Sequence, residues 1–413
     1  MGKRISLIVL AFVLGFTLSA YAEVQNVKVG GDLTMLALSR YGFNLSEPKS
    51  DAGGLVTVAR VRIDADLTDN VGVTLRLLNE RPWGSLEEDA QNTDIDLDLG
   101  YVTLKEFLYS PLVLIIGRQE IHLGSELLIG DVDTNQTANV SASALPAGTR
   151  DLSARKAFDA IVGVLDYSPL KLTLGFAKGN EGNLTASGDD VNVWVANVDY
   201  DFGRMDTLGQ LYYVLVERKK QDVNNIGARI VSKPIDNLSL SAEFCYQSMR
   251  RPSNEGKGHR SDYALIVGAN YTFPNVTWSP SLGIDYSRLS DNWYVMFENM
   301  TPSDIANVLF ANTNAQVIGL TATTKPMEDL TARLRFANFR LVNEISSFTN
   351  EWNSYTMTNK KYLGNEVDLT LTYDYTEDVQ FGLSTGVFLP GKAFDKVNRE
   401  NATQVIGSMK VTF

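Results

Sequence analysis

The chain has 413 residues, of which 44% are hydrophobic and 21% are charged, and its mean hydropathy is −0.09. This hydropathy excludes a membrane protein built from apolar helices, and the formal net charge of −12 argues against nucleic acid as a partner. The single cysteine, Cys245, excludes an intrachain disulfide.

Residues 1–22 have the three parts of a secretory signal peptide. Lys3 and Arg4 form a basic region, an apolar core follows, and a small-x-small cleavage site ends at Ala22. An anchoring transmembrane helix is the alternative, but the apolar stretch is short and no other long apolar run follows it. We therefore expect cleavage after Ala22, which leaves residues 23–413 as one exported domain.

Strand-like segments follow the signal segment up to the C-terminus, and no helical period persists among them. Each segment is about 9 to 14 residues long, which a tilted strand needs to cross a membrane. The segments are 27–39, 55–67, 71–79, 94–104, 112–119, 156–167, 170–178, 191–200, 207–217, 223–232, 238–247, 262–273, 277–289, 315–324, 330–340, 363–375, 379–389 and 402–413. Their number, about 18, is even, as in bacterial outer-membrane barrels.

Short connections alternate with long ones along the chain. Residues 68–70, 167–169 and 376–378 are short turns, whereas 120–155 and 290–313 are long loops. In bacterial barrels the short turns are periplasmic and the long loops are external. The sequence therefore predicts an all-β fold, a single transmembrane antiparallel β-barrel of about 18 strands in the outer membrane of a Gram-negative cell. Whether the 120–155 loop enters the lumen stays open.

The last segment is an amphipathic strand that ends in an aromatic residue. Val405, Met409, Val411 and Phe413 fall on one face at a period of two. We expect this strand to close the barrel, so that no edge stays unpaired in lipid. The expected partners are outer-membrane lipid and, through this strand, the barrel-assembly machinery.

Alternation also sorts charged side chains toward the lumen. In the fourth segment, for example, Ile95, Leu97 and Leu99 are expected to face lipid, opposite Asp96 and Asp98. The residues assigned to the lumen are Arg60, Arg62, Arg76, Asp96, Asp98, Arg229, Glu243, Asp285, Arg333, Arg335, Glu366 and Asp368. Arg118 and Asp159 are placed inside as well, although their strands alternate less cleanly.

Five of these arginines are expected at nearly the same depth. Arg62, Arg76, Arg118, Arg333 and Arg335 lie about five to seven residues above the nearest periplasmic turn, near mid-membrane at about 3.3 Å per residue. With the carboxylates at that level they predict a constriction held by ion pairs, with surplus guanidinium groups free for anions. The alternative is that the charges only solvate a large lumen.

Two segments that flank the longest loop resemble the alginate-export outer-membrane family. These are Gly117-Arg118-Gln119-Glu120, with Leu128-Ile129-Gly130 after it, and the re-entry segment Arg155-Lys156-Ala157-Phe158-Asp159-Ala160. The resemblance implies a monomeric barrel whose narrow charged pore passes an anionic polysaccharide. It places Arg118, Glu120, Arg155 and Asp159 at the pore wall and the loop base.

Weaker patterns leave two other possibilities. Asp131, Asp133 and Asn135 resemble the start of a calcium loop, but the glycine and glutamate of that motif are missing, which favours a polar loop without metal. His122 and Ser125 are three apart, so on a strand they point to opposite faces and make a poor hydrolase pair. We expect a channel without cofactors; a general diffusion porin, a hydrolase or a purely structural barrel are the alternatives.

Overall fold

A computed structural model of the protein describes residues 25–84, 95–132, 145, 148–180, 190–218, 221–250, 258–350 and 352–413. The predicted signal peptide, its cleavage site, Asp133 and Asn135 lie outside the described residues. Within the described ranges no helix is long and apolar enough to cross a membrane.

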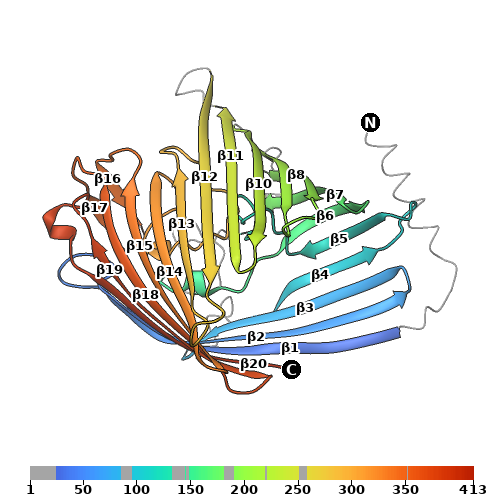
Figure 1. Ribbon diagram of the computed structural model, residues 1–413, viewed down its shortest axis with the longest axis horizontal. Coiled ribbons are helices and arrows are strands. Elements are labelled where there is room, and N and C mark those ends of the chain that lie inside the picture. The colour runs from blue at the N-terminus through green and yellow to red at the C-terminus, as the bar shows by residue number, and fades with distance from the viewer. Residues whose placement is uncertain are drawn as a thin grey trace.

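Eighteen strands form one antiparallel sheet that closes into a barrel, as predicted (Figure 1). They are β1 (Gln25–Tyr41), β2 (Asp51–Thr68), β3 (Val71–Pro82), β4 (Asp96–Leu104), β5 (Leu112–Gln119), β6 (Phe158–Asp166), β7 (Leu170–Asn180), β8 (Val191–Asp201), β9 (Leu208–Glu217), β10 (Val223–Ile235), β11 (Leu238–Arg250), β12 (His259–Thr272), β13 (Ser281–Leu289), β14 (Ala315–Met327), β15 (Leu330–Leu341), β18 (Tyr362–Asp374), β19 (Val379–Pro390) and β20 (Ala402–Thr412). Between them lie the hairpin of β16 (Ser347–Thr349) and β17 (Ser354–Thr356), the helix α2 (Ala306–Leu309) and the 3-10 turns η3 (Arg150–Leu152) and η5 (Lys396–Asn398).

The first and last strands close the barrel. β1 pairs with β20 from Asp32 opposite Thr412 to Tyr41 opposite Thr403. The backbone N–H of Phe413 donates to the carbonyl of Gly31 at 3.0 Å, and the N–H of Gly31 donates back at 2.8 Å. Every strand of the sheet therefore has two neighbours, as the absence of water in a bilayer core requires.

Strand alternation holds along β2 and β3 but fails in β4. Leu99 was expected to face lipid, yet it is only 3% exposed and lies directly opposite Arg76. The pairing of β3 with β4 shifts between Arg76 and Leu77, so that Leu77 opposes Leu97 and Asp98 is the extra residue of a bulge. A bulge turns the following residue to the other face, so Leu99 faces inward and the expectation was wrong.

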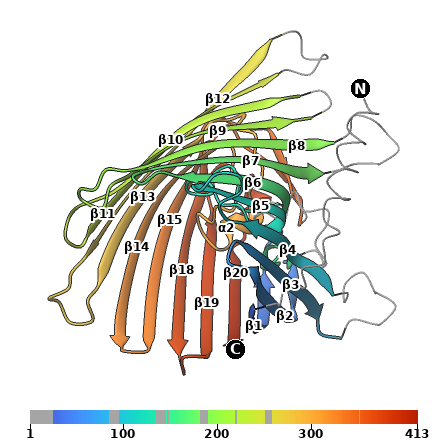
Figure 2. The same cartoon turned by 90° about the vertical axis from the view of Figure 1, so that its right-hand side faces the viewer.

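Two external loops fold into the lumen instead of covering it from outside. The first inward loop joins β5 to β6 and is described at residues 120–132, 145 and 148–157; the second, residues 290–314, joins β13 to β14 and carries α2. Figure 2 shows α2 inside the barrel. All four residues of α2 are buried.

The inward loops cover apolar patches on the barrel's inner wall. The wall residues of the largest patch include Val162, Ala177, Val193, Val195, Val214 and Val216, and the loop residues packed on them include Leu123, Leu127, Leu128, Ile129, Trp293, Met296 and Phe297. Burying one such side chain is worth about 1.5–3 kcal/mol. The loops enter the lumen because this part of the wall is apolar and is otherwise exposed to water.

Candidate functional site

The second inward loop is anchored to the wall by carboxylates of β18. Glu366 accepts hydrogen bonds from the backbone N–H groups of Ile305 at 2.6 Å and Ala306 at 2.8 Å. Asp368 accepts one from the hydroxyl of Ser303 at 2.7 Å. Both carboxylates are buried. Their position behind the loop means that they hold it in place and do not face a passing solute.

Arg335, one of the five arginines predicted near mid-membrane, also belongs to this anchor. Its guanidinium donates to both carboxylate oxygens of Asp285, at 2.7 and 2.9 Å, and its Nε donates to the carbonyl of Pro302 at 2.8 Å. Such a bidentate pair satisfies the guanidinium fork. Arg335 is therefore engaged with the wall and the loop, and it is one of the paired arginines of the constriction and not one of the surplus ones.

The first half of the first inward loop, residues 120–132, reaches the wall at β11, six strands away from β5. The backbone N–H of Ser125 donates to Glu243 of β11 at 3.0 Å, and the hydroxyl of Tyr212 donates to the same carboxylate at 2.6 Å. Arg229 forms an ion pair with Glu243 at 3.5 Å. Glu243 and Arg229 thus lie on the lumen side, where Glu243 holds the loop.

The two inward loops are joined to each other. The N–H of Phe297 donates to the carbonyl of Leu128 at 3.1 Å, and the N–H of Gly130 donates to the carbonyl of Phe297 at 2.8 Å. Asp131 is buried and forms an ion pair with Lys156 within the first loop. A short backbone ladder therefore makes the two loops one constriction.

The second half of the first inward loop, described at residues 148–157, is held by buried ion pairs. Arg40 of β1 is fully buried and donates to both carboxylate oxygens of Asp151, at 2.8 and 2.6 Å. Arg155 donates to Glu80 at 3.3 Å and also pairs with Asp96. Arg40 and Glu80 were missed from sequence, although alternation along their strands was the signal that places them inside.

The arginines of β2 and β3 form a ladder along the inner wall. Arg60 pairs with Asp32 at 2.9 Å, and Arg62 pairs with Asp64 at 2.7 Å. Arg76, directly opposite Arg62, pairs with Asp98 at 2.5 Å and with Glu120. Each of these guanidinium groups already has a carboxylate partner.

Two lumenal arginines remain accessible to water. The side chain of Arg62 is 43% exposed in spite of its partner. Arg333 lies two residues from Arg335 on β15, so it shares the inner face, and it is exposed. Among the described residues Arg333 has no ion-pair partner.

Arg118 and Asp159 lie on the outer face of the barrel, contrary to expectation. They oppose each other across β5 and β6, with an ion pair at 3.3 Å. The next pair on the same face is Ile116 with Ile161, which are 40% and 47% exposed, whereas Phe158 belongs to the buried inner cluster. Alternation did not decide the faces because the inner side of these strands is as apolar as the outer one.

Comparison with known proteins agrees with this architecture. The family model described as "Alginate export" matches residues 189–408, more than half of the chain. The chain belongs to this family. The motif segments from which the resemblance was first inferred lie before the matched region.

The fold of this alginate-export family member is that of solved Pseudomonas aeruginosa channels. OpdO superposes with a TM-score of 0.64 at 12% identity, covering 94% of this chain and 98% of its own. OpdQ gives 0.62 at 12%, covering 94% and 98%, and OccK5 (OpdH) gives 0.62 at 12%, covering 94% and 99%. No curated protein matches the chain. At these identities the likeness shows the fold alone.

Membership of this family makes the protein an outer-membrane channel and not an enzyme. The hydroxyl of Ser125 has no hydrogen-bond partner among the described residues. His122 instead contacts Glu126 at 2.9 Å and lies 4.0 Å from Glu120. In the described ranges no group of His, Cys, Asp and Glu is arranged to hold a metal ion.

His122, Glu120 and Glu126 form a cluster of ionisable side chains. The contact with His122, and secondly the hydrogen bond from Arg76, lower the pKa of Glu120 to about 2, against the opposing effect of burial. The contact with Glu120, followed by the charge of Glu126, raises the pKa of His122. This cluster forms the lumenal base of the first inward loop.

Proposed function

We propose that the protein is a solute-selective channel that passes an anionic solute, an acidic oligosaccharide or polysaccharide strand such as alginate. One observation carries the proposal: the inward loops are bonded to the barrel wall, the first through Glu243 of β11 and the second through Glu366 of β18, and they are also bonded to each other. A constriction held by bonds at both ends keeps its width, and a pore of fixed width can select among solutes. An open barrel of this strand number leaves a wide aqueous channel.

The charge of the proposed solute follows from the arginines that water reaches. Arg62 and Arg333 offer exposed guanidinium groups, and Arg60 and Arg76 flank Arg62 on the ladder. A planar guanidinium suits the carboxylate that each uronate unit carries. Because Arg62 already binds Asp64, a passing carboxylate must exchange with it, so the solute is held weakly enough to leave.

A general diffusion porin of little specificity is the second candidate. It is favoured by the carboxylate partners of Arg60, Arg76 and Arg335, which neutralise most of the positive charge on the wall. In that case the charges solvate the lumen without selecting a solute.

The route to the membrane is part of the proposal. We infer that residues 1–22 direct export and are removed after Ala22, and that residues 23–413 form the mature domain. The C-terminal strand β20 would then be recognised by the barrel-assembly machinery before it pairs with β1.

The test is single-channel recording of the refolded protein in a planar bilayer. Reversal potential is measured in a salt gradient, and block is measured with oligouronates and with neutral oligosaccharides of equal length. We expect anion preference and block by oligouronates only, both reduced in the double variant Arg62→Ala and Arg333→Ala. The matched control is Arg118→Ala, an arginine on the outer face, which should change neither.

The opposite result is equally clear. A pore that prefers cations, or one that oligouronates and neutral sugars block alike, contradicts the anionic-solute proposal and supports the general porin.

A further inference from the structure

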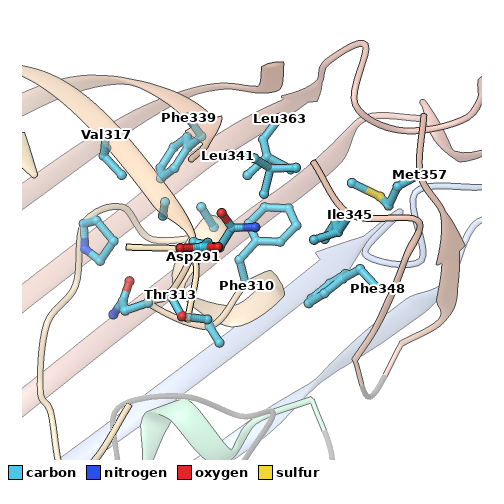
Figure 3. A pocket seen from close by; sticks show the side chains of 16 residues that line it. Asp291, Phe310, Thr313, Val317, Phe339, Leu341, Ile345, Phe348, Met357 and Leu363 are labelled. Carbon is cyan, nitrogen blue, oxygen red and sulfur yellow. The ribbon is translucent and has the colours of Figure 1, made fainter. Parts of the chain in front are cut away.

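An apolar cavity of about 220 Å³ lies behind the second inward loop (Figure 3). Its floor is the inner wall of β14, β15 and β18, where Val317, Phe339 and Leu363 are buried. Phe310 of the second inward loop and Phe348 of β16 form the partly exposed sides. The cavity is separate from the charged ladder of β2 and β3.

The polar side chains at this cavity are mostly bonded elsewhere. Asn314 exchanges two hydrogen bonds with the backbone of Asn343, at 2.9 and 2.8 Å. Asn312 donates to Glu298 at 3.2 Å, and the hydroxyl of Thr313 donates to the carbonyl of Trp293 at 2.7 Å. These groups therefore leave an apolar interior for a guest molecule.

Asp291 is the exception, since it is the one charged residue among those that line the cavity. Its carboxylate accepts a hydrogen bond from the side-chain amide of Asn343 at 2.6 Å. No Lys or Arg of the described residues forms an ion pair with it. Figure 3 shows Asp291 beside Phe310, within the ring of apolar side chains. In the described part of the chain, a carboxylate that no Lys or Arg pairs with thus lies at the wall of an apolar cavity.

Size and lining together define a ligand class. The cavity is larger than the about 150 Å³ that suffices to hold benzene in an apolar protein interior, and its aromatic walls suit a ring packed edge to face. Phe310 and Phe348 already pack against each other, with ring centroids 5.7 Å apart and ring planes tilted by 48°. An ammonium group on the same guest would give Asp291 a charged donor.

We propose that this cavity binds a small amphiphilic cation, an aromatic or short aliphatic body that carries one ammonium group. The ligand has the opposite charge to the solute proposed for the pore, so the inference does not depend on what the channel conducts. The cavity touches both the second inward loop and the barrel wall, so an occupant bridges the constriction to the wall.

The test is calorimetric titration of the protein, refolded into lipid nanodiscs, with benzylamine, benzyl alcohol and benzoate. Nanodiscs avoid detergent tails, which would compete for an apolar cavity, and empty nanodiscs correct for partition into lipid. We expect one saturable site that prefers benzylamine over benzyl alcohol by about tenfold, as a charged hydrogen bond allows. Benzoate should bind most weakly.

Variants separate the two parts of the site. Asp291→Asn should weaken benzylamine by about tenfold and leave benzyl alcohol unchanged, with the turn variant Asp236→Asn as the matched control. Ala311→Phe, at the cavity wall, should abolish the binding of both. Val317→Phe fills the floor instead, should the first variant fail to fold.

Three results would overturn the proposal. They are the absence of saturable benzylamine binding, binding that both filling variants leave intact, and benzoate binding as tight as that of benzylamine. None of these measurements uses ion conduction, so failure here is distinct from failure of the proposed channel function.

Discussion

The two inward loops occupy the same lumen but are held by different chemistry (Figure 2). In the first loop, charges of both signs meet: Arg40 binds Asp151, and Arg155 binds Glu80. In the second loop, Glu366 binds backbone N–H groups and has no basic partner among the described residues. Removing one charged side chain should therefore destabilise the first loop. The second loop depends instead on buried carboxyl groups, on the hydrogen bonds that they accept and on their protonation.

The largest effect is expected from breaking the ion pair of the first loop. Arg40→Met leaves the carboxylate of Asp151 without its partner in a buried setting, which should cost about 3–5 kcal/mol. Urea unfolding of the protein in lipid vesicles measures this loss. The freed loop should also raise single-channel conductance.

A second substitution separates the cost of an unpaired buried carboxylate from the cost of lost packing contacts. In the double variant Arg40→Met and Asp151→Leu no charge is left uncompensated, so stability should return close to that of the wild type. A double variant as unstable as Arg40→Met alone would mean that lost packing, and not the unpaired carboxylate of Asp151, causes the loss of folding stability.

The next effect comes from a buried acid of the second loop. Burial raises the pKa of Glu298 to about 7, so the folded state holds a proton that the unfolded chain releases near pH 4.5. Folding stability should therefore fall as pH rises between these values, by about 3 kcal/mol in all. Glu298→Gln keeps an acceptor for the N–H of Met300 but cannot ionise, so it should remove this part of the pH dependence.

Unfolding midpoints between pH 4.5 and 8 measure this difference. Glu344→Gln, in the following external loop, is the matched control, because Glu344 is exposed. If the wild type and Glu298→Gln lose stability in parallel over this range, the buried carboxyl of Glu298 is not the group that titrates.

Replacing the acceptor of the second loop should have a somewhat smaller effect. Glu366→Gln substitutes an amide N–H₂ for one of the two oxygens that receive Ile305 and Ala306. One buried N–H group then faces a donor, at a cost of about 1–3 kcal/mol. The loosened loop should appear as added current noise in single-channel records, and noise equal to that of the wild type would show that the anchor is dispensable.

Sequence alone predicted the barrel because its requirements repeat in every strand. Val61, Ile63, Leu75 and Leu77 alternate with polar residues, and they are exposed on the outer face as expected. Strand number and closure through β20 followed from the same period. This alternation is a local property of each strand, so it can be recognised without knowing which loops occupy the lumen.

The constriction is not local, and there the predictions failed. Placing Arg118 inside assumed that an apolar face must meet lipid, yet Phe158 on the opposite face is buried under the inward loops. A counter-signal was present, since Val193 and Val195 make the inner face of β8 apolar and Leu127 begins an apolar run in the first loop. A depth count also cannot pair charges, so it could not say which arginines are surplus, and Asp285 binds Arg335.

The smallest effect is expected at the base of the first loop, where pH changes charge without unfolding the loop. Contact with Glu120 raises the pKa of His122 above 6.5, so its stabilising charge is fully present below pH 6.5 and is lost as pH rises through the raised value. The side chain is 50% exposed, so solvent screening limits the stability change to a few tenths of a kcal/mol. The added positive charge should still shift the reversal potential toward anions at pH 5.5 relative to pH 9. His122→Gln should reduce that shift to the part that Glu298 contributes, while His259→Gln, at the exposed start of β12, should retain it in full; a shift unchanged without His122 would mean that His122 is not the titrating group.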